Sequence, residues 1–100
     1  MYARVVTVQV QPGKMDEFWR RIREAAPAVQ ARRGFHEGRF LTDTHTGTVL
    51  GVTLWETEAD AKAAPVGGAE GGPLRELLTT PAVVAYYEVS MGFARDMGSC

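Results

Sequence analysis

The sequence predicts an α+β domain of the ferredoxin-like type, in which four antiparallel strands form one sheet and two helices cover one face. Four stretches rich in β-branched and aromatic residues alternate with two helical patterns, in the order β-α-β-β-α-β. The stretches 48–55 and 81–91 are apolar on both alternating faces, whereas a strand covered on one side has one polar face. Two helices cover only one face of the sheet. The second apolar face therefore predicts a homodimer that packs sheet against sheet.

The first half of the chain contains one strand and the longer helix. Val5 to Val10 is rich in β-branched residues and predicts a strand over about residues 2–10, which Gln-Pro-Gly then ends. Apolar residues then recur at helical spacing, and the helix carries Arg32 and Arg33 in its last turn and ends at Gly34. Pro27 predicts a kink or a broken turn just before it. The apolar stripe of this helix comprises Met15, Phe18, Trp19, Ile22, Ala26 and Val29.

The second half contains a hairpin, short helices and the last strand. Strands over about 35–42 and 48–55 are joined by a five-residue turn, so they form an antiparallel hairpin. Thr57 three residues before Asp60 is typical of a helix N-terminus. Pro73 favours a further short helix over 74–78, and the last strand is expected over about 82–91. Right-handed crossovers place both main helices on the same face of the sheet.

Length and composition fit one domain over residues 1–100, ordered over about 2–91 and followed by a tail, 92–100. The formal net charge is −1, which does not favour nucleic acid as a partner. No apolar run approaches 18 residues, so no membrane span is expected. The single cysteine, Cys100, allows no internal disulfide and favours a cytoplasmic location.

Three motifs resemble the antibiotic biosynthesis monooxygenase (ABM) family of the dimeric α+β barrel superfamily. They are Val-x-Val-x-Pro-Gly-Lys at the end of the first strand, Arg-Arg-Gly-Phe after the first helix, and Leu-Trp-Glu-Thr-Glu-Ala-Asp-Ala at 54–61. The resemblance covers about residues 2–91. It implies a homodimer with a pocket between sheet and helices in each subunit. In several members it also implies oxidation of polycyclic phenols or quinols by molecular oxygen without metal or flavin.

The chain departs from this family in two places. Members commonly have a histidine about nine residues after the tryptophan of the third strand, where this chain has Ala64. The related haem-degrading branch uses an asparagine, a tryptophan on the second helix and a histidine. This chain has no asparagine, and neither Trp19 nor Trp55 falls on the second helix. The resemblance therefore does not imply haem degradation.

His36 is the candidate catalytic residue, because an imidazole titrates near neutral pH and a phenol must lose a proton before it reacts with oxygen. The alternative is a surface or interface histidine that is simply hydrogen-bonded. Two histidines and one terminal cysteine form no recognisable metal site, and no cofactor is expected. The glycine-rich segment 66–72 lacks the strand-to-helix context of a phosphate loop, and we interpret it as a flap beside the pocket.

Aromatic residues are the candidates for binding a flat aromatic ligand. Tyr86 and its neighbour Tyr87 must face opposite sides of the sheet, so one lines the pocket and the other meets the partner subunit. Arg4 and Arg39 could stabilise a phenolate or form surface ion pairs. Tryptophans in such positions more often serve in packing than in binding a ligand. The predicted ligand-binding residues are Trp19, Phe40, Trp55 and Tyr86.

Two functions follow from these features. The first is a cofactor-independent monooxygenase that acts on an aromatic phenol or quinol. The alternative is a non-catalytic dimer of the same fold that binds or senses a small ligand.

Overall fold

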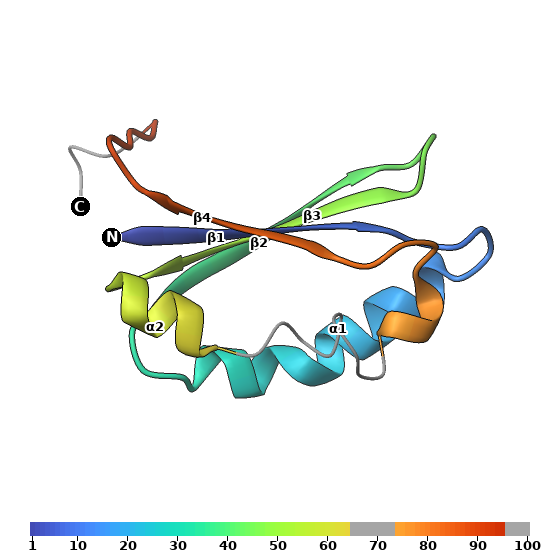
Figure 1. The fold of residues 1–100 in the computed structure, drawn as a ribbon, viewed down its shortest axis with the longest axis horizontal. Helices are drawn as coiled ribbons and strands as arrows, with labels where there is room; N and C mark the ends of the chain where they lie inside the picture. The colour runs from blue at the N-terminus through green and yellow to red at the C-terminus, as the bar shows by residue number, and fades with distance from the viewer. Residues whose placement is uncertain (65–73, 96–100) are drawn as a thin grey trace.

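The computed structural model describes residues 1–64 and 74–95 and confirms the predicted α+β fold (Figure 1). Four antiparallel strands form one sheet in the order β2-β3-β1-β4, and both helices lie on one side of it. The segment 66–72, predicted to be a flap, lies outside the described residues. The elements are β1 (Tyr2–Gln9), α1 (Met15–Gln30), β2 (Phe35–Asp43), β3 (Thr48–Trp55), α2 (Glu58–Ala63), the 3₁₀ turn η1 (Arg75–Leu77) and β4 (Val83–Glu88).

Helix α1 ends earlier than its sequence suggests. Its C-cap is Ala31, so Arg32 and Arg33 lie beyond the helix, and the prediction that they occupy its last turn was wrong. The helix continues through Pro27 to Gln30 without a broken turn. Gly34 has a φ of 81°, which a glycine adopts without strain, and it turns the chain into β2. At the start of α2, the Thr57 hydroxyl accepts a hydrogen bond from the Asp60 backbone N–H, as predicted.

The face of the sheet that packs against the helices holds two apolar clusters. The first lies beneath α1 and η1, where Phe18 is the only fully buried residue of α1. The second lies beneath α2, where Trp55 has no exposed surface and packs against Ala61 and Ala64. Helix α1 contributes Phe18 to the first cluster and Val29 to the edge of the second, so the space between α1 and the sheet extends from one cluster to the other. The first cluster comprises Val8, Val10, Phe18, Val49, Leu74, Leu77 and Leu78.

The opposite face of the sheet carries no helix of the described residues (Figure 1). It is mainly apolar, with Glu37 and Arg39 on β2 as charged exceptions. Paired residues share a face, so the pairs of Ala3 with Tyr87 and of Val5 with Val52 place all four side chains there. Tyr86 pairs with Arg4 and therefore lies on the helix side, which settles the orientation that the sequence left open. We call this surface the open face. Three of its large apolar residues are more than half exposed: Leu41 (54%), Val83 (65%) and Tyr87 (58%).

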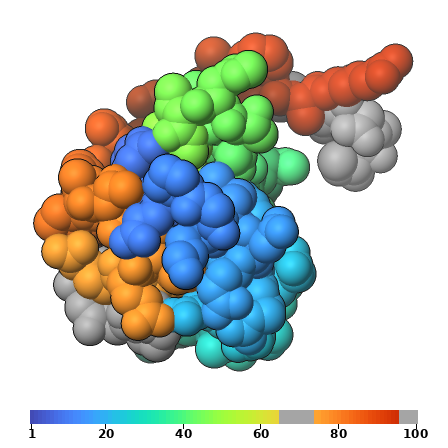
Figure 2. All heavy atoms as spheres, turned by 90° about the vertical axis from the view of Figure 1, so that its right-hand side faces the viewer, coloured from blue at the N-terminus to red at the C-terminus, as the bar shows by residue number. Residues whose placement is uncertain are grey.

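The chain leaves the body of the molecule after β4. This strand ends at Glu88, three residues earlier than expected, and the following segment projects outward (Figure 2). Met91 and Phe93 in this segment are largely exposed. Among the described residues, no helix is both long and apolar enough to span a membrane.

Candidate functional site

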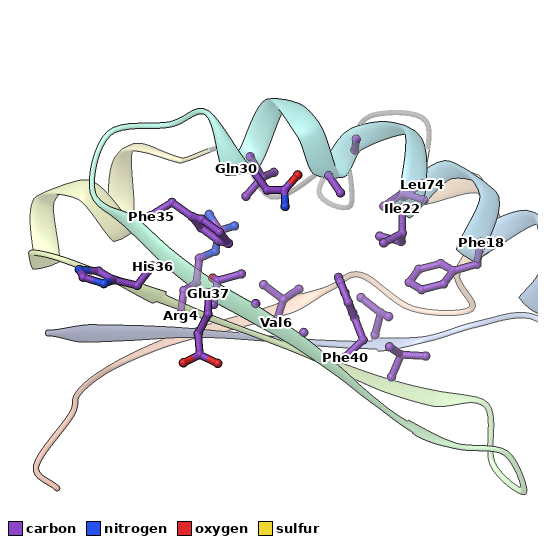
Figure 3. A pocket seen from close by; sticks show the side chains of 18 residues that line it. Arg4, Val6, Phe18, Ile22, Gln30, Phe35, His36, Glu37, Phe40 and Leu74 are labelled. Carbon is purple, nitrogen blue, oxygen red and sulfur yellow. The ribbon is translucent and has the colours of Figure 1, made fainter. Parts of the chain in front are cut away.

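A cavity of about 440 Å³ lies between α1 and the sheet (Figure 3). This volume falls in the range of pockets that enclose small organic ligands. Its roof is formed by apolar side chains of α1, including Phe18, Ile22 and Val29, and its floor by the helix-side residues of β1, β2 and β3. The family resemblance alone implied a pocket here, and the structure contains a cavity at this place.

Rows of paired residues across the sheet make up the floor and give it two different ends. Gly38, Thr53 and Arg4 form one row, in which each residue pairs with the next across the strands. Two residues further along each strand, Phe40, Gly51 and Val6 form the next row. The floor is therefore polar at the first row and apolar at the second.

Arg4 is the charged residue at the polar end. Arg4 is only 4% exposed. It comes from β1, one of the two inner strands of the sheet. One of its guanidinium nitrogens, Nη1, donates a hydrogen bond to the Ala64 carbonyl oxygen at 2.6 Å. The guanidinium carbon lies 5.6 Å from the centre of the Trp55 ring, within the range of a cation–π contact. Arg4 is thus held in place at the wall of the cavity.

Two uncharged polar side chains accompany Arg4. The Thr53 hydroxyl accepts a hydrogen bond from Trp55 Nε1 at 2.9 Å, so the position of its oxygen is fixed by a buried ring. Gln30 reaches the cavity from the last turn of α1, and Figure 3 shows its amide directed toward the sheet. These groups can donate hydrogen bonds to an oxygen atom of a ligand.

Two phenylalanines from β2 form side walls. Phe35 meets Trp55 edge-on with ring centres 5.3 Å apart, and Phe40 meets Trp19 in the same way at 5.4 Å. Phe40 covers Gly51, where an added Cβ would lie 2.9 Å from the ring. The absence of a side chain at Gly51 therefore allows the Phe40 ring to lie close over the floor.

The structure places the four predicted ligand-binding residues at different depths. Phe40 lines the cavity directly. Trp19 and Trp55 lie one layer behind it, in contact with the wall residues Phe40 and Phe35. Tyr86 packs against the cluster beneath α2, and Lys62 lies over its ring. The predicted residues gather around the cavity, but only Phe40 borders it.

His36 sits at a break in the pairing of β2 with β3. Phe35 pairs with Trp55 and Glu37 with Leu54, so His36 is the extra residue of a β-bulge. His36 is one of the residues that line the cavity, but its ring points away from it (Figure 3). His36 Nε2 lies 2.5 Å from Glu56 Oε2, and the imidazole is 42% exposed. The role of His36 as a base stays a prediction and requires its ring to turn toward the cavity.

Charged groups with shifted pKa values lie mainly outside the cavity. Hydrogen bonds from Arg20 and then Arg21 lower the pKa of the Glu17 carboxyl to about 2 on the outer side of α1. Arg39, which the sequence offered as a phenolate partner, instead pairs with Glu37 on the same strand at 3.3 Å. Within residues 1–64 and 74–95, no group of histidine, cysteine or carboxylate side chains could hold a metal ion.

A sequence model described as antibiotic biosynthesis monooxygenase matches residues 1–64, more than half of the chain. No curated protein matches the sequence.

Solved structures share the fold at low sequence identity. A protein of unknown function from Nitrosomonas europaea superposes with a TM-score of 0.77 at 19% identity, over 93% of this chain and 92% of that one. A candidate antibiotic biosynthesis monooxygenase from Deinococcus radiodurans gives 0.75 at 16% identity, over 94% and 97% of the two chains. The heme-degrader MhuD from Mycobacterium tuberculosis, solved with two hemes in its active site, gives 0.73 at 22% identity, over 94% and 100%. At these identities the likeness shows the fold alone.

Proposed function

Since the chain belongs to the antibiotic biosynthesis monooxygenase family, we propose that it binds a flat aromatic phenol or quinol and oxygenates it without a cofactor. Family membership supports the coarser statement that this is a monooxygenase or small-molecule-binding protein. The observation that carries the finer proposal is the cavity itself, which has aromatic walls, an apolar roof and one polar end.

This reaction requires few protein groups beyond such a cavity. A deprotonated phenol can itself donate electrons to molecular oxygen, so the protein must hold the ring, exclude water and accept a proton. Phe35 and Phe40 are placed to flank a ring, and Phe18 and Ile22 exclude water at the apolar end. His36 is our candidate for the proton acceptor, after rotation of its side chain away from Glu56.

A second candidate function is ligand binding or sensing without catalysis, and one observation favours it. Among the described residues that line the cavity, the titratable side chains are Arg4, His36 and Glu37. The side chains of His36 and Glu37 point away from the cavity in Figure 3. At the position where members of the family commonly have a histidine, this chain has Ala64. Its polar group is the backbone carbonyl, which accepts the hydrogen bond from Arg4.

We also propose that the protein acts as a homodimer in the cytoplasm, joined through the open face. A stable interface needs about 800 Å² from each partner, and an apolar face across four strands can provide an area of that order. Burial of Leu41, Val83 and Tyr87 against a second copy would remove large apolar side chains from water.

Oxygen uptake separates the two functions. The native chain is incubated with a panel of quinols and anthrone-like phenols, and the His36→Ala variant is compared with it. The matched control is His45→Ala, because His45 lies exposed in the β2–β3 turn, away from the cavity. Saturable oxygen uptake that falls in His36→Ala but not in His45→Ala supports the monooxygenase. Saturable binding without oxygen uptake leaves the binding function. The absence of any binding across the panel contradicts both.

A further inference from the structure

Gly38 lies where the cavity reaches the edge of the sheet. In the strand order β2-β3-β1-β4, β2 is an edge strand, and Gly38 lines the cavity from within it. The neighbouring side chains of His36 and Glu37 turn away from the cavity (Figure 3). Between Phe35 and Phe40, therefore, no side chain of β2 closes the cavity toward the edge of the sheet.

The backbone conformation does not explain why position 38 is a glycine. Gly38 is part of β2 and, unlike Gly34, does not have a positive φ. A glycine within a strand weakens it, because the backbone loses more conformational freedom on folding and no side chain packs. Position 38 therefore carries a cost in stability that the backbone itself does not require.

Packing among the described residues does not explain this glycine either. A Cβ added to Gly38 would lie 3.4 Å from Thr53 Cγ2 and 3.7 Å from Phe35 Cζ, which are ordinary van der Waals distances. Gly51 differs, because a Cβ added there would lie 2.9 Å from the Phe40 ring. The space above Gly51 is thus filled by a side chain of the protein, whereas the space above Gly38 belongs to the cavity.

We infer that Gly38 is a residue that determines ligand specificity, because the ligand ring occupies the space that a side chain at position 38 would fill. The ring then lies over the backbone of Gly38, between Phe35 and Phe40, and extends toward the edge of β2. A glycine in a strand often marks such a close approach of a ligand to the backbone. This inference rests on the proposed function in so far as the ligand is aromatic, and it holds with or without oxygenation.

Calorimetric titration of a size series at position 38 tests this role. The variants are Gly38→Ala, Gly38→Val and Gly38→Leu, and the probes are phenol, with one ring, and 2-naphthol, with two. We expect the affinity for 2-naphthol to fall about threefold in the alanine variant and tenfold or more in the valine and leucine variants. Phenol is small enough to bind at the apolar end near Phe18 and Ile22, so its affinity should stay within about threefold of the native value.

Urea unfolding of the same variants separates ligand specificity from a structural role. Valine is favoured in strands, and Gly38 does not need a conformation that valine avoids, so the unfolding midpoint of Gly38→Val should equal or exceed the native one. The matched control is Gly92→Val, since a Cβ at Gly92 would meet no atom within 4 Å and Gly92 does not line the cavity. This control should keep the native affinity for both probes.

If Gly38→Val and Gly38→Leu fail to fold by circular dichroism, Gly38→Ala decides, because its methyl fits at 3.4 Å from Thr53. A threefold loss of 2-naphthol binding with phenol binding retained supports the inference. Native affinity for 2-naphthol in the folded variants overturns it, as does an equal loss for both probes, and both results leave the proposed function intact. Failure of the native protein to bind either probe instead overturns the proposed function together with the inference.

Discussion

Both faces of the sheet are mainly apolar, but the described helices cover only one of them. On β1, Arg4 and Val6 face the helices, and Val5 between them faces the open side. The helix side is covered by α1 and α2 and encloses a cavity with a buried cation. None of the described helices covers the open side, which exposes Leu41 and Tyr87. We propose that alternate residues of this strand serve two functions, ligand binding on one face and association on the other.

The largest effect is expected on the helix side, where Trp55 has no exposed surface and supports both Arg4 and Phe35. Trp55→Ala should lower the free energy of unfolding by about 3–5 kcal/mol, since truncation leaves a large cavity. Urea unfolding followed by circular dichroism measures this loss. Trp19→Ala, in a partly exposed position, should cost clearly less. Equal losses for the two variants would mean that Trp55 is not the centre of its cluster.

On the open face, the largest effect is expected on association and not on folding. Val5 pairs with Val52 and Ala85 near the middle of the sheet, so Val5→Asp places an unpaired charge in the proposed interface. We expect the native protein to sediment as a dimer at micromolar concentration and the variant as a folded monomer. Ala28→Asp, which adds the same charge to an exposed position of α1, is the control and should remain a dimer. A native protein that sediments only as a monomer would remove the proposed interface.

A smaller effect is expected at the cavity floor. In Gly51→Ala the new methyl would lie 2.9 Å from the Phe40 ring, so the ring must move outward. Because Phe40 is partly exposed, we expect a loss of only about 1 kcal/mol in stability, at the low end for overpacking, together with weaker binding of aromatic ligands. Calorimetry measures the binding. Gly92→Ala is the control, since its methyl would meet no atom within 4 Å and Gly92 does not line the cavity. Unchanged binding in Gly51→Ala would show that Phe40 does not shape the site.

The smallest effect is expected for the ion pairs of Glu17 with Arg20 and Arg21 on the surface of α1, which belong to neither face of the sheet. The pKa of Glu17 is lowered from 4.5 to about 2, mainly by hydrogen bonds from Arg20. A lowered folded-state pKa contributes stability above the unfolded pKa, and this contribution is lost as the pH falls from 4.5 to about 2. The native protein should therefore lose slightly more stability than Glu17→Gln over this range, as thermal melts at low salt would show. Identical losses would indicate that the pairs contribute nothing.

The strand and helix order could be predicted from the sequence because the periodicity of apolar residues depends only on local geometry. The apolar stretch 48–55 and the Thr57 cap each match the structure within one or two residues. The end of α1 could not be predicted in this way. Arg32 and Arg33 suit a helix C-terminus, but the turn at Gly34 begins after Gln30.

The site was less predictable, because it depends on register. The side of the sheet on which Tyr86 and Tyr87 each lie follows from the pairing of β4 with β1, and no local sequence pattern specifies this pairing. The bulge at His36 shifts that side chain away from the cavity, and it leaves no mark in the alternation of β2. Arg4 did leave a signal, since it is a charged residue in the same alternating set as Val6 and Val8. Its burial became apparent only once the position of α2 was known.

The division of function between the faces is tested most directly by nuclear Overhauser effects from a bound aromatic ligand to valine methyl groups. Val5 and Val6 are neighbours in sequence and point to opposite faces, so they form an internal control. We predict contacts from the ligand ring to the methyl groups of Val6 and Val49 and none to those of Val5 and Val52. Contacts to Val5 and Val52 without contacts to Val6 would place the ligand on the open face and contradict the account.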